Sequence, residues 1–270
     1  MNVTILGAGT AIPARDHSPA GLFVEAGGER LLFDAGPGTL QRLHAAGGSL
    51  FTLDRVFLTH YHLDHCLDLA SLLFALRIPA PSPGAAPRWL RHLPRQAGES
   101  RPPRAPLAVY GPPGLKRLYR RLNRALNGWL TPRHYALRLK ELKETSVKLG
   151  KGATVRARWM RHAAPALGYR LEAEGKRIAY SGDTDVCDAL VELGRDTHLL
   201  ILECSVPDER KVAGHLTPTE CGRIAAAANC RHLALTHFYP VFKGYDIRGR
   251  VRRAFRGRLT LARDFTSFTL

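Results

Sequence analysis

The chain has 270 residues with 45% hydrophobic content, which is enough for one large core or two stacked half-domains and excludes wholesale disorder. Its 40 Lys and Arg residues outnumber 23 Asp and Glu residues, and the net charge of +17 favours phosphate-bearing partners. The opening residues, MNVTILGAGTAIPARDH, lack the features of an export signal, and no apolar run reaches the roughly 18 residues of a membrane span. We therefore expect a soluble, cytoplasmic protein that makes no membrane contact.

Short apolar runs alternate with amphipathic stretches along the chain, which predicts an α/β layered fold rather than a helical bundle or an all-β sandwich. The expected strands are residues 3–6, 21–25, 30–33, 55–58, 107–110, 154–159, 168–171, 177–180, 199–202 and 232–235. The expected helices are residues 38–46, 65–76, 113–126, 185–193 and 217–227. The last helix opens with Thr217-Pro218-Thr219-Glu220, which has an N-cap, a proline and a capping-box glutamate in the right order.

Residues 77–106 differ from these elements because they are crowded with proline and arginine and show neither strand nor helix periodicity. We expect a long loop inserted into a single domain that spans residues 1–270. The loop carries one acid, Glu99, against six arginines: Arg77, Arg88, Arg91, Arg95, Arg101 and Arg104. With Trp89 and His92 able to stack on unpaired bases, it is a candidate RNA grip. The alternative is a solvated or dimer-contacting loop.

The strongest chemical signal is the run from Thr59 to His65, THYHLDH, directly after the expected strand 55–58. Imidazoles and carboxylates are the ligands that zinc-like ions prefer. On an extended chain His60 and His62 point to the same side and can bind one ion. Asp64 and His65 lie where the chain turns into the next helix, where they can reach a second ion.

Three further candidate ligands, His162, Asp183 and His237, each follow an expected strand. Gly182 allows a tight turn that presents the Asp183 carboxylate so that it can bridge both ions. Each of the three has an ordinary alternative, such as a capping aspartate or a core histidine. Their shared position at strand ends favours ligands. We therefore expect two divalent ions, with Zn²⁺ as the first choice and Mn²⁺ or iron as alternatives.

These motifs resemble those of the metallo-β-lactamase superfamily, and within it the ribonuclease Z-like branch. The resemblance covers nearly the whole chain and rests on ILGAGTAIP, LLFDAGPGT, LTHYHLDH, VYGPPGL, LGYR, YSGDTD, ILECS, GHLTPTE and ALTHFYP. It implies a four-layer αββα sandwich with the site in a cleft between the two sheets. It also implies one ion on His60, His62, His162 and Asp183, and another on Asp64, His65, Asp183 and His237. Asp34 would orient these ligands; the alternative is a turn aspartate.

The resemblance implies a metal-dependent hydrolase, and we expect a phosphodiesterase or endonuclease that acts on RNA 3′ ends or on small phosphodiesters. Asp64 is expected to orient the nucleophile. His215 matches the histidine that protonates the leaving group in ribonuclease Z-like enzymes, with Glu203 holding it. The alternatives are a loop histidine beside the N-cap for His215 and an ordinary strand-end acid for Glu203.

Other functions remain open. A lactone or sulfate ester hydrolase of the same fold is the main enzymic alternative, and a non-enzymic accessory or RNA-binding protein with a structural metal is another. Ribonuclease Z enzymes commonly carry a flexible arm that grips transfer RNA, between segments that correspond to LGYR and YSGDT. Here only LEAEGKRIA separates them, the length of a hairpin, which weighs against a dedicated transfer-RNA role. The sequence leaves open whether the chain forms a homodimer.

Overall fold

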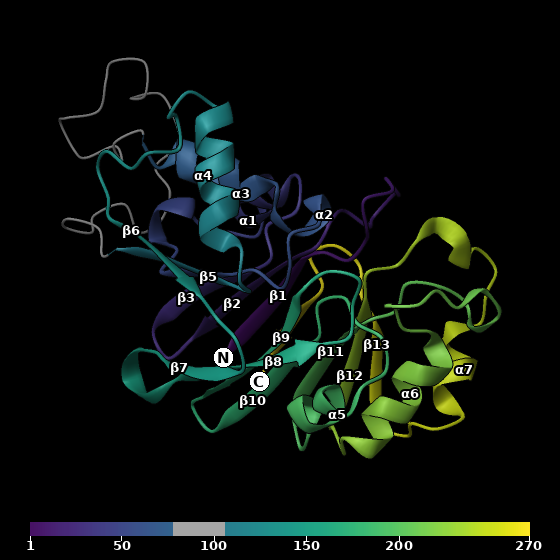
Figure 1. The fold of residues 1–270 in the computed structure, drawn as a ribbon. Coiled ribbons are helices and arrows are strands. Elements are labelled where there is room, and N and C mark those ends of the chain that lie inside the picture. Colours follow the sequence, from purple (N-terminus) through teal and green to yellow (C-terminus); the bar gives the residue numbers. More distant parts are fainter. Residues whose placement is uncertain (78–105) are drawn as a thin grey trace.

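The computed structural model describes residues 1–77 and 106–270. Within these residues the strands form two seven-stranded sheets that lie face to face, and helices cover the outer face of each sheet (Figure 1). This arrangement is the four-layer αββα sandwich that the sequence predicts. Apart from Arg77 and Pro106, the expected loop and its proposed RNA grip lie outside the described residues.

The first sheet has the strand order β14-β1-β2-β3-β4-β5-β6 among the residues that the structure describes. Its strands from β3 to β6 run parallel, whereas β14, β1, β2 and β3 pair antiparallel. The strands are β1 Asn2–Gly7, β2 Gly21–Ala26, β3 Glu29–Phe33, β4 Arg55–Phe57, β5 Leu107–Gly111, β6 Leu137–Glu141 and β14 Ser267–Thr269. The helices on this side are α1 Thr39–Ala45, α2 Leu63–Cys66, α3 Asp68–Ala75 and α4 Leu115–Ala125.

The second sheet has the order β13-β12-β11-β10-β9-β8-β7, and its strands from β10 to β13 run parallel. The strands are β7 Thr145–Lys148, β8 Thr154–Met160, β9 Ala166–Ala173, β10 Lys176–Tyr180, β11 Leu199–Glu203, β12 His232–Thr236 and β13 Arg258–Leu261. The helices on this side are α5 Asp188–Gly194, α6 Pro218–Ala227 and α7 Ile247–Arg252. Short 3-10 turns lie at Leu50–Thr52, Gly150–Gly152, Asp208–Arg210 and Pro240–Phe242.

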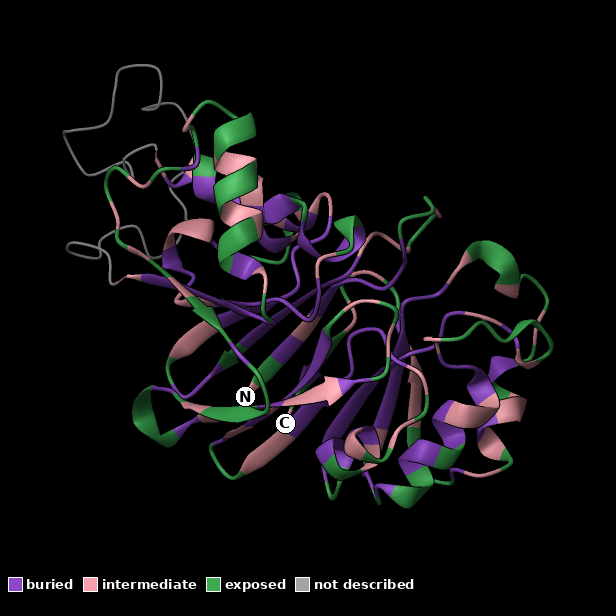
Figure 2. Ribbon diagram, in the orientation of Figure 1, coloured by how far each residue is buried: buried purple, intermediate pink, exposed green. Residues whose placement is uncertain are grey.

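The main core lies between the two sheets, and two further apolar clusters lie between each sheet and its helices. Figure 2 shows the strands mostly buried and the outward helix faces exposed. Aromatic rings fill the centre of the main core: Phe57 stacks between Phe33 and Tyr110, with ring centroids 5.1 and 4.6 Å away. Tyr169 from the second sheet meets the edge of Phe57 at 5.4 Å, so these rings join the two halves.

Every expected strand is present, within two residues at either end, and the capping box of α6 is confirmed. Strands β6, β7, β13 and β14 and helix α7 are not among the elements expected from the sequence. These strands lie at sheet edges and are short, so that even the alternation of LRLK in β6 and RLTL in β13 extends over only four residues. The partner of β14, which is β1, is distant in sequence and gives no local signal, whereas β7 pairs with β8 across a short turn.

Two expected helices have different bounds. The helix expected at 65–76 starts earlier and is divided at Leu67, because Ala35 of a neighbouring loop bonds the backbone of His65 and Asp68. The helix expected at 185–193 starts only at Asp188. Asp185 instead forms a bridge with Arg161 and does not belong to the helix.

The segment where ribonuclease Z enzymes carry an arm is a hairpin, as expected. Strands β9 and β10 pair from Ala173 and Lys176 onwards, with only Glu174 and Gly175 between them. None of the helices in the described ranges is long and apolar enough to cross a membrane.

The aromatic stack should contribute measurably to the free energy of unfolding. We expect Phe57→Ala to lower it by about 3–5 kcal/mol, because the ring is fully buried and its loss leaves a cavity between the sheets. The matched change Phe74→Ala, at a ring that is 47% exposed, should cost less than about 1 kcal/mol. Urea denaturation of both variants measures the difference, and equal losses would contradict this picture of the core.

Candidate metal centre

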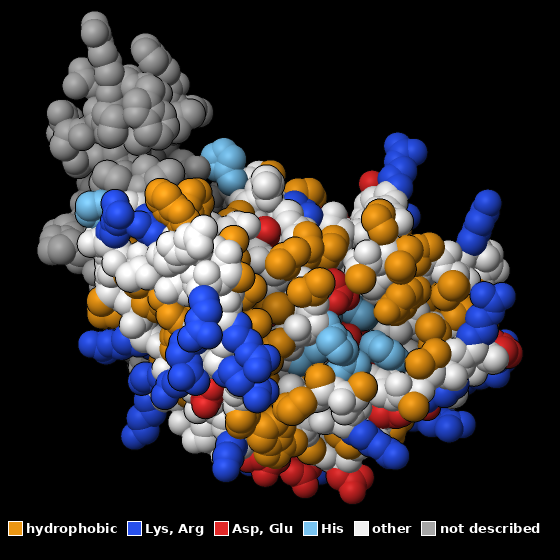
Figure 3. Space-filling view, turned by 45° about the horizontal axis from the view of Figure 1, so that its top comes forward, with side chains coloured by type: hydrophobic (Ala, Val, Ile, Leu, Met, Phe, Trp, Pro, Cys, Tyr) orange, Lys and Arg blue, Asp and Glu red, His pale blue; other side chains and the backbone are white. Residues whose placement is uncertain are grey.

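The expected ligands gather at one edge of the two sheets, where the carboxyl ends of the strands meet. His60 and His62 follow β4, and Asp64 and His65 lie in the short helix α2. From the second sheet His162 follows β8, Asp183 follows β10 and His237 follows β12. Figure 3 shows exposed histidines in a hollow of the surface, with acidic side chains beside them. The loops of both halves therefore build one cleft.

Three groups of side chains in this cleft are close enough to hold metal ions, and the first two consist of the expected ligands. The first is His60, His62, His162 and Asp183. Its imidazole nitrogens face one another: His62 Nδ1 lies 3.0 Å from His60 Nε2 and 3.3 Å from His162 Nε2. Asp183 Oδ2 lies 3.7 Å from His60 Nε2.

The second group is Asp64, His65 and His237. The Nε2 atoms of His65 and His237 are 3.2 Å apart, and Asp64 Oδ2 lies 3.8 and 3.5 Å from them. Asp183 Oδ1 lies 3.3 Å from His65 Nε2 and 3.4 Å from His237 Nε2. The two carboxylate oxygens of Asp183 therefore face different groups.

These separations fit metal coordination. With metal–nitrogen distances near 2.1 Å, the edges of a tetrahedral ligand set are about 3.4 Å long. Asp183 Oδ1 is buried and lacks a hydrogen-bond partner within the described part of the chain, although a buried carboxylate oxygen needs a proton donor or a cation. The His/Asp cluster is thus able to bind divalent metal.

Buried charges around the cleft keep the acids ionised. Burial opposes ionisation of Asp183, but His237 and His65 hold the pKa of its carboxyl well below the usual value. Burial likewise opposes ionisation of Asp64, while the hydrogen bond from His237 and the charge of His65 lower its pKa to about 2. Burial and the charge of His65 hold the pKa of His60 well below its usual value, so His60 is neutral. The two carboxylates and the neutral imidazole of His60 are thus in the forms that bind cations, whereas a protonated His65 must lose its proton to do so.

Asp34, directly after β3, orients the ligands of the first half. Its buried carboxylate accepts hydrogen bonds from the Thr59 backbone N–H (2.8 Å), His65 Nδ1 (2.8 Å) and the Tyr180 hydroxyl (2.9 Å). Thr59 Oγ1 also donates to Asp34 and accepts from His60 Nδ1 at 3.0 Å. The imidazoles of His60 and His65 are therefore both held with Nε2 toward the cleft. Asp34 thus lies where it can orient these two side chains.

Glu203, at the end of β11, orients side chains of the second half in the way that Asp34 does in the first half. Only 1% of it is exposed. Its Oε1 accepts from Thr184 N (2.9 Å) and His215 Nδ1 (3.0 Å), and its Oε2 accepts from Ser205 Oγ (2.6 Å) and Leu216 N (3.1 Å). Burial opposes protonation of His215, but the hydrogen bond and charge of Glu203 raise the pKa of the imidazole above its usual value.

Ser205 joins the cleft, although it is not among the site residues expected from the sequence. Its hydroxyl donates to Glu203, so its oxygen accepts from His237 Nδ1 at 3.0 Å and leaves His237 Nε2 facing the cleft. The local signal for a site residue at this position is that Ser205 follows the buried strand β11, two residues after Glu203.

Lys211 is likewise not among the expected site residues, and it holds the loop that carries His215. Its ammonium donates to Asp185 Oδ1 and Glu220 Oε2, both at 2.7 Å, and to the His215 carbonyl oxygen. Asp185 Oδ2 accepts from Gly214 N, and the Gly214 carbonyl oxygen accepts from His162 Nδ1 at 2.9 Å. The same loop therefore positions His162 and His215.

The chain is similar in sequence and in fold to known proteins. The family model of the metallo-beta-lactamase superfamily matches residues 16–195. A Streptomyces coelicolor protein named Ribonuclease Z is 31% identical, over 98% of this chain and 96% of that protein. The crystal structure of the short form of human tRNase Z has a TM-score of 0.75 at 25% identity, covering 100% of this chain and 99% of that one. YhfI of Bacillus subtilis, a metallo-beta-lactamase fold protein, shares the fold with a TM-score of 0.78 at 23% identity. The match covers 99% of this chain and 98% of YhfI.

Removal of single ligands should change the metal content. We expect about two ions per chain in the purified protein, and fewer in His62→Ala and Asp183→Ala, because each variant removes part of a ligand group. His134→Ala, at an exposed histidine outside both groups, is the control and should keep the wild-type content. Elemental analysis measures the ions. A wild-type protein that binds no transition metal even after loading would refute the metal centre.

Proposed function

The chain belongs to the metallo-β-lactamase superfamily, and we propose that it is a two-metal phosphodiesterase of the ribonuclease Z type. The observation that carries this proposal is the position of Asp183 between two ligand groups, one carboxylate oxygen toward each. A single structural ion would not need this arrangement. Two ions a few ångströms apart are typical of enzymes that cleave phosphate esters.

We assign His60, His62, His162 and Asp183 to one ion, and Asp64, His65, Asp183 and His237 to the other. Imidazole-rich sets with carboxylates suit Zn²⁺, with Mn²⁺ and iron as alternatives. When bound, such ions activate water as a nucleophile and neutralise negative charge on the phosphodiester oxygens.

Two side chains of the protein would then act on the reacting atoms. The Asp64 carboxylate is ionised and lies in the cleft, where it can accept a hydrogen bond from the attacking water and orient it. His215 is held by Glu203 through Nδ1, while its Nε2 has no hydrogen-bond partner among residues 1–77 and 106–270. An Nε2–H in this position can pass its proton to the departing alkoxide. Glu203 acts as a positioning residue.

The substrate we propose is RNA near its 3′ end, or a small phosphodiester. The similarity to proteins named Ribonuclease Z over nearly the whole chain supports RNA, as does the net charge of +17. The His215–Glu203 pair supports a poor leaving group, because an alkoxide needs a proton to depart. It also argues against an accessory protein, since a structural metal site has no use for a proton donor in an open cleft.

A substrate panel tests the reaction class. We expect the metal-loaded protein to hydrolyse aryl phosphodiesters and to cleave an RNA that carries an unpaired 3′ tail, and to be much slower on lactones and sulfate esters. Initial rates on all four, with the chelator-treated protein as control, give the comparison. Faster turnover of a lactone or a sulfate ester than of every phosphodiester would overturn the proposal.

A second prediction separates the proton donor from a ligand, since His215 also lies close enough to Asp183 and His237 to share an ion with them. His215→Ala should keep its metal content yet lose roughly 10²- to 10⁴-fold in rate on an alkyl phosphodiester. The loss should be much smaller for nitrophenolate, which departs without a proton. Equal losses on both substrates, or loss of an ion, would count against the proton-donor role.

A further inference from the structure

Helix α4 carries a dense strip of positive charge. Its five basic residues, Lys116, Arg117, Arg120, Arg121 and Arg124, are all exposed. At 3.6 residues per turn they fall within about 140° of the helix surface and extend about 12 Å along it. None of them lies within ion-pair distance of a carboxylate of the described residues. The nearby Glu141, whose pKa is lowered by backbone hydrogen bonds and by the charges of Lys116 and Arg120, accepts the backbone N–H groups of Gly114 and Lys116.

The opposite face of α4 is already covered. Leu115 is buried, and Leu118, Tyr119 and Leu122 pack against the apolar cluster on the first sheet. A basic helix that binds a lipid surface needs a free apolar face along its length, and α4 has none between Leu115 and Arg124; the exposed side chains of Leu126 and Trp129 lie beyond its carboxyl end, away from the cleft. The free face offers only cations, which fits a partner recognised through its phosphates.

The amino end of α4 touches the metal-binding loop. Tyr61, between His60 and His62, donates its hydroxyl to the Pro112 carbonyl oxygen just before the helix. A Cβ on Gly111 would lie 2.9 Å from the Tyr61 hydroxyl oxygen, so the turn and the ring are in close contact. Figure 3 shows a group of Lys and Arg side chains to the left of the cleft, separated from its histidines by a narrow band of apolar and uncharged surface. The basic strip therefore begins at the rim of the cleft.

We propose that the exposed face of α4 binds the phosphate backbone of RNA whose scissile bond lies in the metal cleft. A double-stranded nucleic acid carries about one negative charge per 1.7 Å, so a strip of about 12 Å can meet several phosphates. Arginine suits this role because its guanidinium binds phosphate oxygens in pairs. This inference rests on the proposed RNA-cleaving function and names the surface that holds the substrate.

The test replaces the four arginines of α4 together, as R117Q/R120Q/R121Q/R124Q. Glutamine has nearly the helix propensity of arginine, so the helix should persist. For a stem-loop RNA with an unpaired 3′ tail we expect Kd and KM to rise about tenfold or more, and the slope of log affinity against log salt to become shallower by roughly 3. Turnover of a small aryl phosphodiester should stay within about twofold, because it does not reach α4.

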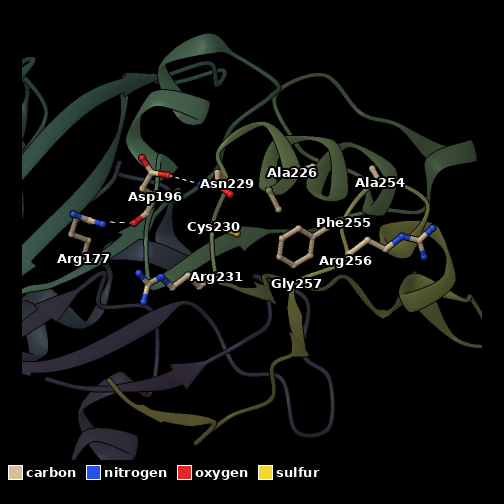
Figure 4. Close-up of a pocket in the computed structure, with 11 residues that line it drawn as sticks. Arg177, Asp196, Ala226, Asn229, Cys230, Arg231, Ala254, Phe255, Arg256 and Gly257 are labelled. Atoms are coloured by element: carbon tan, nitrogen blue, oxygen red, sulfur yellow. Dashed lines mark hydrogen bonds between the residues drawn. The ribbon is translucent and has the colours of Figure 1, made fainter.

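The control removes the same charge elsewhere. Arg231 and Arg256 line a pocket at the amino ends of the parallel strands of the second sheet, on the edge opposite the metal cleft (Figure 4). Lys176 begins β10 and Arg258 begins β13 at that same edge. The variant K176Q/R231Q/R256Q/R258Q should change RNA affinity less than about threefold if position and not net charge decides binding.

Each outcome has a definite meaning. Selective loss of RNA affinity in the α4 variant supports the inference. Equal losses in both variants would overturn it, because net charge alone would then explain binding. Wild-type affinity in the α4 variant, or α4-dependent binding of anionic lipid vesicles without any effect on RNA, would also overturn it while leaving RNA cleavage intact. If the wild-type protein hydrolyses the aryl phosphodiester but neither binds nor cleaves the RNA, the proposed RNA substrate itself is wrong.

Discussion

The burial of the Asp183 carboxylate is the constraint on which the cleft depends. A carboxylate that is only 2% exposed, with one oxygen lacking a proton donor within the described residues, is stable only beside cations or imidazolium groups. His60, His65 and His237 surround it from loops of both sheets. Gly182 makes this approach possible: it has a φ of +58°, and a Cβ there would lie 2.6 Å from Thr59. The two halves thus meet at position 182, where only glycine fits without a clash.

Two further buried carboxylates, one in each half, give the cleft its geometry. Asp34 holds His65 directly and His60 through Thr59, while Glu203 holds His215 directly and His237 through Ser205. Every oxygen of these carboxylates accepts hydrogen bonds, so their burial does not leave uncompensated charge. Imidazoles fixed in this way need little rearrangement to bind a metal ion. Residues that hydrogen-bond to metal ligands usually have this orienting function.

The net charge of the chain says less about its partners than the distribution of that charge. Basic side chains occupy both α4, next to the cleft, and the far edge of the second sheet. Only the first set is joined to the metal loop, through the contact of Tyr61 with the turn before α4. The two sets of basic residues therefore differ in their position relative to the cleft, although both carry a surplus of arginine. Under the proposed function, distance from the cleft decides which of the two surfaces can contact a substrate that is bound there.

The sequence by itself determined the fold class, the family and the residues that meet in the cleft. These follow from local patterns: apolar strands, the HYHLDH loop and the capping box of α6, all of which lie within short segments. The family is confirmed by the family model and by similarity to a Ribonuclease Z. Only the tertiary structure decided how the ligands are held, because Asp34 meets Tyr180 and Lys211 meets Asp185 across long sequence separations. It also decided that α4 starts at the cleft, since hydrogen bonds between distant segments leave no periodic trace in the chain.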